Sequence, residues 1–176
     1  AAGRGRCWSM VILITAILKA HWRCGKKGQI KKGGKHIFID AGANIGTHSV
    51  YALQSGYFDR AIAIEPNPEN YALLERNIAD NKLQDKVSLF HAALGTEDGE
   101  ATLELSANHS GDHRVRIDES GQNADAKLKG EATRETITVP LRSLDSIAEE
   151  CGVKDITSVF VSIDVQGFEA HILDGA

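Results

Sequence analysis

The sequence contains few cysteines, and their spacing excludes two classes of small stabilised fold. The three cysteines, Cys7, Cys24 and Cys151, lie far apart, are odd in number and lack the C-x-x-C or Cys/His spacing of a zinc site. A disulfide framework is therefore not expected. Among the seven histidines, no H-x-x-x-H pair falls on a recognisable helix. We predict no metal site.

A long hydrophobic run is also missing. Residues 10–18 form an apolar stretch far shorter than the roughly twenty residues that a membrane-spanning helix needs. This stretch lies within a basic N-terminal segment, residues 1–36, for which three interpretations stay open. It could be an amphipathic helix packed beside a sheet, a membrane-surface or targeting segment within residues 8–35, or flanking sequence with Met10 as a start. A cytoplasmic location without a transmembrane span is the favoured prediction.

Neither sign of charge dominates the chain. Twenty basic residues against twenty-four acidic ones give a net charge of -4, so the overall charge does not predict a nucleic-acid partner. With 176 residues, 42% of them hydrophobic, the chain can bury the core of one domain and is short for two. We predict a domain over residues 37–176 after the N-terminal segment. The composition indicates no particular oligomeric state.

From residue 36 onward, predicted strands and helices alternate, which is typical of a parallel sheet wrapped by helices. Apolar runs predict strands that end at Asp40 and Glu65, and two more over residues 87–93 and 158–164; helices are predicted over residues 47–54, 69–79 and 144–150. Period-two alternation predicts a peripheral antiparallel pair over residues 101–105 and 136–141. The polar segment 106–135 between these two is predicted to be a lid, a binding loop or disordered.

The turn after the first predicted strand contains the pattern that indicates a ligand-binding site. A carboxylate and two glycines, Asp40, Gly42 and Gly46, stand in the pattern acid-x-Gly-x-x-x-Gly. A dinucleotide fingerprint, G-x-G-x-x-G, would need glycines at the positions of Asn44 and Thr47. An NAD-dependent oxidoreductase is therefore disfavoured. An acid beside a turn where side chains are absent suits a ligand that carries positive charge.

A second acid, Glu65, closes the apolar run that ends at Ile64. This is the position of the ribose-binding acid in a β-α-β nucleoside site, because two ribose hydroxyls can both donate to one carboxylate. The alternative is a solvated residue before the turn at Pro66. Asp164 ends the last predicted strand, and parallel strands bring their carboxyl ends to one edge of a sheet, where ligands bind. We expect the three acids to surround one nucleoside-sized pocket.

Several blocks of the sequence, in order, resemble the FkbM-type S-adenosylmethionine-dependent methyltransferases. They are residues 40–46 (DAGANIG), 63–68 (AIEPNP), 77–81 (NIADN), 91–95 (HAALG), 163–169 (IDVQGFE) and 173–176 (LDGA). The resemblance implies an α/β fold with a Rossmann-like class I methyltransferase sheet. It also implies that the chain is truncated after the fourth core strand and its helix, which would leave an inner strand as an exposed edge.

The resemblance implies S-adenosylmethionine as the cofactor and assigns residues to it. Asp40 would face its amino-acid end, Glu65 would bind the ribose, and two small residues after the third strand would flank the adenine, although they could equally be ordinary sheet packing. The implied cofactor-binding set is Asp40, Gly42, Ala43, Asn44, Gly46, Glu65, Asn67, Ala92 and Ala93. Asn67 with Pro68 is also predicted to cap the second helix. His48 is a further candidate for ligand contact.

For the acceptor, Asp164 is the candidate catalytic residue, either as the base or in positioning the acceptor, with a helix cap as the alternative. Gln166, Glu169, His109 and Ser110 are candidate substrate residues. Gln166 departs from the family, where glutamate is frequent at this position. His113 stands four residues after His109 in a polar segment, where a solvated or acceptor-touching role is favoured over a metal.

The predicted function is methyl transfer from S-adenosylmethionine to a hydroxyl oxygen of a small molecule or glycan. The oxygen specificity is implied by the resemblance alone. The alternative is a nucleoside-binding or adenosylmethionine-binding module without catalysis.

Overall fold

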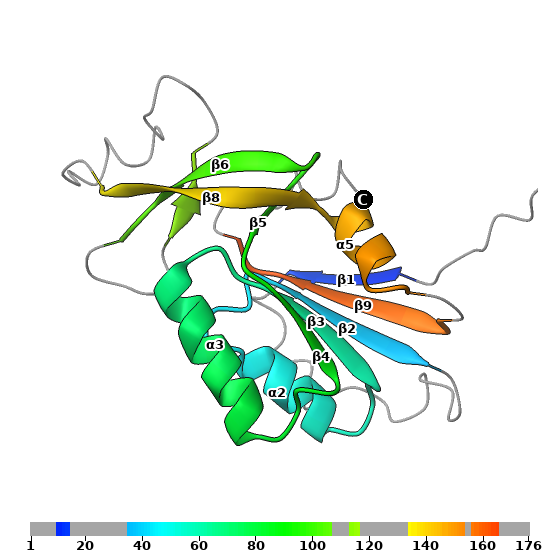
Figure 1. Ribbon diagram of the computed structural model, residues 1–176. Helices are drawn as coiled ribbons and strands as arrows, with labels where there is room; N and C mark the ends of the chain where they lie inside the picture. The colour runs from blue at the N-terminus through cyan, green and yellow to red at the C-terminus, as the bar shows by residue number, and fades with distance from the viewer. Residues whose placement is uncertain (1–9, 15–34, 107–112, 117–133, 154–155, 166–176) are drawn as a thin grey trace, which may run out of the picture.

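Two sheets and three helices make up the part of the chain that the computed structural model describes, which is residues 10–14, 35–106, 113–116, 134–153 and 156–165 (Figure 1). In chain order the elements are β1 (Met10–Ile14), β2 (His36–Ala41), α2 (Thr47–Gln54), β3 (Arg60–Ile64), α3 (Pro68–Asp80), β4 (Val87–Phe90), β5 (Ala93–Gly95), β6 (Gly99–Glu104), β7 (Arg114–Val115), β8 (Thr136–Ser143), α5 (Leu144–Glu150) and β9 (Ser158–Ile163). The α/β class is confirmed.

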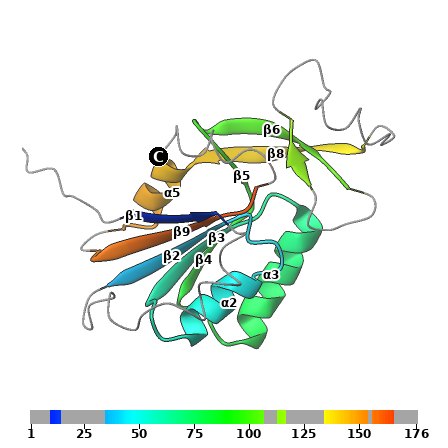
Figure 2. The same cartoon turned by 180° about the vertical axis from the view of Figure 1, so that it is seen from behind.

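The first sheet is parallel throughout and has the strand order β1-β9-β2-β3-β4. Helices α2 and α3 cover one of its faces, and α5 lies on the opposite side, as both views show (Figures 1 and 2). The central strand β2 is buried along its whole length. Because both faces of such a strand are covered, its sequence is an almost unbroken apolar run and not an alternation of apolar and polar residues.

Successive side chains of β2 point to the two cores on opposite faces of the sheet. Ile39 belongs to the core that includes Ile147 of α5. Phe38 belongs to the core that includes Leu74 of α3, and its ring stacks on the ring of Phe160 with a centroid distance of 5.7 Å. The ends of β2, β3 and β9 are thereby held side by side, and this fixes the positions of the turns that follow them.

The second sheet has the order β5-β8-β6-β7 and lies across the carboxyl edge of the first sheet (Figure 1). The predicted antiparallel pair is confirmed, since β6 pairs antiparallel with β8. Strand β7 lies inside the segment predicted to be a loop and pairs with β6. Its two residues are too few to produce a recognisable pattern in the sequence.

The predicted helices are confirmed, with α2 and α5 at the predicted bounds and α3 one residue longer at each end. The single strand predicted over residues 87–93 is wrong, because the chain changes sheets within it. Phe90 still pairs with the first sheet, since its carbonyl accepts the backbone N–H of Glu65 at 3.0 Å. Ala93 already pairs with Leu141 of β8. The apolar pattern runs through the break because the residues on both sides of it are buried or partly buried.

Of the three interpretations of the N-terminal segment, the amphipathic helix is wrong for Met10–Ile14, which forms strand β1 parallel to β9. Valine and isoleucine favour strands, and β1 pairs with the edge of β9 that lies away from β2. The exposed inner edge predicted for β9 is also wrong, because β9 pairs with β1 on one side and β2 on the other.

The rest of the N-terminal segment, up to residue 34, lies outside the described residues. Among the described helices, none is long and apolar enough to cross a membrane.

Candidate functional site

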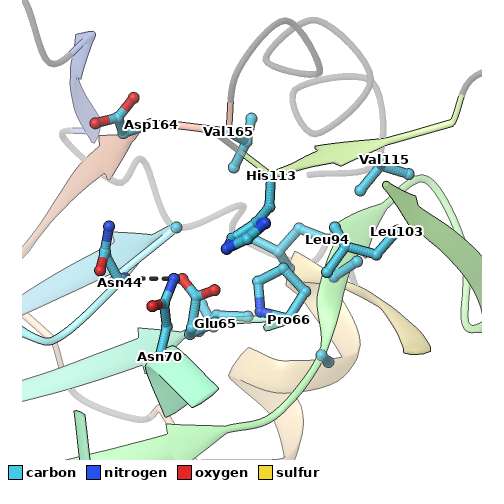
Figure 3. Close-up of a pocket in the computed structure, with 14 residues that line it drawn as sticks. Asn44, Glu65, Pro66, Asn70, Leu94, Leu103, His113, Val115, Asp164 and Val165 are labelled. Atoms are coloured by element: carbon cyan, nitrogen blue, oxygen red, sulfur yellow. Dashed lines mark hydrogen bonds between the residues drawn. The ribbon is translucent and has the colours of Figure 1, made fainter. Parts of the chain in front are cut away.

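A pocket of about 80 Å³ lies at the carboxyl edge of the first sheet, beneath the second sheet (Figure 3). The turns after β2, β3 and β9 form one side of it, and residues of β5, β6 and β7 in the second sheet contribute to the other. The lining residues are Gly42, Asn44, Ile64, Glu65, Pro66, Asn70, Ala92, Ala93, Leu94, Leu103, His113, Val115, Asp164 and Val165. Six of the predicted site residues are among them: Gly42, Asn44, Glu65, Ala92, Ala93 and Asp164.

Glu65 is held in the pocket by hydrogen bonds from two different turns. Its Oε2 accepts the backbone N–H of Asn44 at 2.8 Å, and its Oε1 accepts the backbone N–H of Asn67 at 2.9 Å. The side chain of Asn70 also bonds to it. Burial raises the pKa of the Glu65 carboxyl, while these hydrogen bonds favour the charged form. The alternative of a solvated residue before a turn is wrong, because Glu65 is only 5% exposed.

Asp40 is placed differently, and it does not line the pocket. It is 1% exposed and accepts the Ser49 hydroxyl at 2.7 Å through Oδ2, while His48 Nδ1 lies 3.9 Å from Oδ1. Burial raises the pKa of the Asp40 carboxyl, and the hydrogen bonds from the Ser49 side chain and backbone oppose this rise. The carboxylate therefore faces the first turn of α2 and not the pocket.

The two glycines of the turn are required by close contacts within the protein. Gly42 has a φ of +79°, and a Cβ at this position would lie 2.1 Å from the backbone oxygen of Asp164. Gly46 has a φ of +83°, and a Cβ there would lie 2.5 Å from Cδ1 of Leu74 in α3. Gly42 lines the pocket, whereas Gly46 faces the helix packing. Ala43, also predicted at the site, is buried in the core below the turn.

Asn67 is the N-cap of α3, as predicted, because its side chain accepts the backbone N–H of Asn70 at 2.9 Å. Its own backbone N–H donates to Glu65. Asn67 is not a lining residue of the pocket, so its contribution to the site is to orient Glu65.

Asp164 directly follows β9 and is exposed, and its backbone N–H donates to the carbonyl of Ala41 at 2.9 Å. In Figure 3 Asp164 and Asn44 stand at one end of the pocket, and Leu94 and Leu103 stand at the other. Two of the three predicted carboxylates, Glu65 and Asp164, thus share the pocket, while Asp40 is buried beneath the turn. The other predicted acceptor residues, His109, Ser110, Gln166 and Glu169, lie outside the described residues.

The sequence analysis missed two polar residues of the pocket, Asn70 and His113. For Asn70 the only sequence signal was its position three residues after the capping Asn67. His113 was noted only as the partner of His109. Within the described ranges, no group of three or more His, Cys, Asp or Glu side chains could hold a metal ion. Cys151 is a free thiol.

The chain matches the model of one protein family over most of its length. The family model for the methyltransferase FkbM domain matches residues 40–176. The methyltransferase sdnD of Sordaria araneosa is 26% identical over 156 residues, which are 79% of this chain and 60% of that protein. This chain thus spans less than two thirds of that relative. A solved structure, the methyltransferase FkbM from Methylobacillus flagellatus KT, aligns with a TM-score of 0.48 and 20% identity over 81% of this chain and 28% of its own.

Proposed function

The chain belongs to the FkbM methyltransferase family, and from this premise we propose that it binds S-adenosylmethionine and methylates a hydroxyl oxygen of a small molecule or glycan. The observation that carries the proposal is the arrangement of Glu65. A buried carboxylate is held by backbone N–H groups of two turns and lines a pocket at the carboxyl edge of a parallel sheet.

The residues around Glu65 fit the nucleoside half of such a cofactor. A carboxylate has about four acceptor sites, and on Glu65 two are used by backbone N–H groups and a third by the side chain of Asn70. The remaining capacity suits a donating hydroxyl of a ribose. Ala92 and Ala93 line the same pocket with the smallest side chains other than glycine, which leaves room for a planar base.

The other end of the pocket fits the amino-acid half and the acceptor. Gly42 presents backbone without a side chain, Asn44 adds a side-chain amide, and Asp164 adds an exposed carboxylate. S-adenosylmethionine supplies an electrophilic methyl carbon on a sulfonium sulfur. The protein then has to hold the acceptor hydroxyl in line and remove its proton, and we assign the proton to the carboxylate of Asp164. Gln166, Glu169, His109 and Ser110 stay candidates for acceptor binding.

The test separates cofactor binding from turnover. Calorimetric titration with S-adenosylmethionine should show binding, and release of S-adenosylhomocysteine in the presence of hydroxyl-bearing acceptors should show transfer. Asp164→Asn should bind the cofactor with unchanged affinity and turn over slowly. Binding without turnover on any acceptor would establish the non-catalytic module in place of the enzyme. Absence of binding to the wild-type chain would refute the proposal.

A further inference from the structure

His91 lies where the chain passes from the first sheet to the second. It directly follows β4 and precedes Ala92 and Ala93, which line the pocket. Its Nε2 lies 3.1 Å from the carbonyl oxygen of Pro66. Because a carbonyl oxygen only accepts, Nε2 is the ring nitrogen that carries a hydrogen, and it donates this hydrogen to Pro66.

The ring of His91 makes a second contact, with the start of α3. It stacks on the ring of Tyr71 with a centroid distance of 4.9 Å and an interplanar angle of 24°. Tyr71 lies in the first turn of α3, where its backbone N–H donates to the carbonyl of Asn67 at 2.8 Å. Because the stack limits the orientations of the imidazole, the hydrogen bond to Pro66 costs little side-chain freedom.

The peptide bond between Pro66 and Asn67 is hydrogen-bonded at both of its ends. The carbonyl oxygen accepts from His91, and the N–H donates to Glu65 Oε1 at 2.9 Å. No cis peptide bond occurs among the residues that the structure describes, so this planar unit holds its C=O and N–H in opposite directions. A hydrogen bond that fixes the carbonyl therefore also fixes the direction of the N–H toward the carboxylate.

Pro66 offers only its carbonyl for holding the turn, because proline has no backbone N–H. A hydrogen bond to a carbonyl also polarises the peptide and strengthens the bond that its N–H makes. The carboxylate of Glu65, which receives this N–H, is buried and also accepts the backbone N–H of Asn44 through its other oxygen. Loss of the His91 bond should therefore loosen one of the two backbone contacts that orient Glu65.

We propose that His91 is a positioning residue of the candidate site, which holds the Pro66–Asn67 peptide and, through it, the carboxylate of Glu65. Pro66 and Glu65 line the pocket (Figure 3), whereas His91 does not. His91 therefore acts through this peptide and not by touching a ligand. Its effect on the turn stands on the contacts of the protein itself, and its effect on S-adenosylmethionine affinity rests on the proposed function.

Three variants of His91 separate the hydrogen bond from the ring contact. His91→Phe keeps a ring beside Tyr71 and loses the donor, His91→Gln keeps an N–H donor and loses the ring, and His91→Ala loses both. His91 is exposed, so these changes leave the core intact. Gln54→Ala is the control, because it removes an exposed side-chain hydrogen bond of 2.9 Å to Asn81 at the other end of α3.

Hydrogen exchange of the Asn67 backbone N–H, followed by NMR, tests the turn without a ligand. Exchange should be about three- to tenfold faster than in the wild-type chain in His91→Phe and His91→Ala, because the opposite end of the peptide loses its hydrogen bond. It should stay within about twofold of wild type in His91→Gln and Gln54→Ala. Wild-type exchange in His91→Phe would overturn the proposal, and an equal acceleration in Gln54→Ala would assign the effect to a general loosening of α3 and overturn it too.

Calorimetric titration with S-adenosylmethionine tests the consequence for the site. Affinity should fall about three- to tenfold in His91→Phe and stay within about twofold of wild type in His91→Gln and Gln54→Ala. In a Glu65→Ala background, His91→Phe should change the affinity by less than about twofold, because the carboxylate that His91 positions is gone. An equal fall in both backgrounds would show that His91 acts on the ligand by another route and would overturn the inference. A wild-type chain that binds no S-adenosylmethionine would instead refute the proposed function, and hydrogen exchange would still decide the role of His91 in the turn.

Discussion

Two turns at the same edge of the first sheet each carry an acid at the end of a strand, but the two carboxylates point in different directions. Each follows a buried parallel strand that ends near an acid, and each leads into a helix on the same face. After β2, the carboxylate of Asp40 turns back to its own helix and bonds to Ser49. After β3, the carboxylate of Glu65 stays in the pocket and receives N–H groups from both turns.

The difference lies in which side chain accepts hydrogen bonds from the first turn of each helix. Helix α3 has a capping side chain, Asn67, whereas the N-cap position of α2 is Gly46, which has none. Asp40 supplies the missing acceptor, because its carboxylate accepts hydrogen bonds from the hydroxyl and the backbone N–H of Ser49 in the first turn of α2. Of the two acids, the one that lines the pocket is thus the one whose following helix is capped by another residue, Glu65.

The largest effect should come from filling the close contact in the first turn. Gly42→Ala would place a Cβ against the backbone oxygen of Asp164 at a φ of +79°, and we expect a loss of about 3–5 kcal/mol in the free energy of unfolding. Gly56→Ala is the matched control, because its φ is +73° but nothing lies within 4 Å of the added carbon. It should cost about 1–2 kcal/mol. Urea denaturation of both variants measures the difference, and equal losses would show that the contact with Asp164 is unimportant.

A second prediction separates the two acids by ligand binding. Glu65→Gln should weaken S-adenosylmethionine by about 1–3 kcal/mol, since a carboxamide offers one acceptor oxygen in place of two and leaves donors unpaired. Asp40→Asn should weaken it by less than about 1 kcal/mol, because Asp40 does not line the pocket. Calorimetric titration of the two variants checks the comparison. A greater loss in Asp40→Asn would reverse the assignment of the two turns.

The buried carboxylate of Asp40 also predicts a pH dependence of stability. Burial raises its pKa above the ordinary value of 3.8, so the folded chain binds this proton more tightly than the unfolded chain. The free energy of unfolding should therefore fall as the pH rises from 3.8 through the folded pKa, and it should be highest relative to Asp40→Asn at the acid end. Denaturation of both proteins at several pH values measures the difference. A wild-type advantage that grows with pH would contradict the raised pKa.

The smallest effect should come from the cap of the second turn. Asn67→Ala removes the acceptor for the Asn70 N–H and should cost about 1 kcal/mol of stability. Ser143→Ala removes the equivalent bond to Ser146 at the start of α5, away from the pocket, and should cost a similar amount. S-adenosylmethionine affinity should fall only for Asn67→Ala, whose loosened turn also holds Glu65. Unchanged affinity in titrations of both variants would mean that the backbone of the turn keeps its place without the cap.

The elements that the sequence predicted well are those with strong local patterns. Helix α2 begins directly after its glycine turn, and the apolar spacing of α3 gives its length to within a residue at each end. The predictions failed where partners far along the chain decide the structure. The sequence of β1 suits a strand as well as a helix, and its pairing with β9, about 150 residues later, settles the choice. The break between β4 and β5 depends on β8 in the same way.

The site residues divide in the same way, into those that local patterns predicted and those that distant contacts placed. Glu65 and Asp164 were predicted at the pocket and line it, because parallel strands deliver their ends to one edge. The direction of the Asp40 side chain was not predictable, since it depends on which donors surround the carboxylate. His113 was not predictable as a pocket residue, since the strand that follows it, β7, is placed by its pairing with β6.

By itself, the sequence determined the succession of strand, turn and helix and the acids that stand at the strand ends, because hydrophobic periodicity and turn chemistry act between near neighbours in the chain. Only the tertiary structure decided which acid lines the pocket and which accepts hydrogen bonds from the start of a helix. The reason is that a buried carboxylate points to its hydrogen-bond donors, and for Glu65 one of these is the backbone of Asn44 on a different turn.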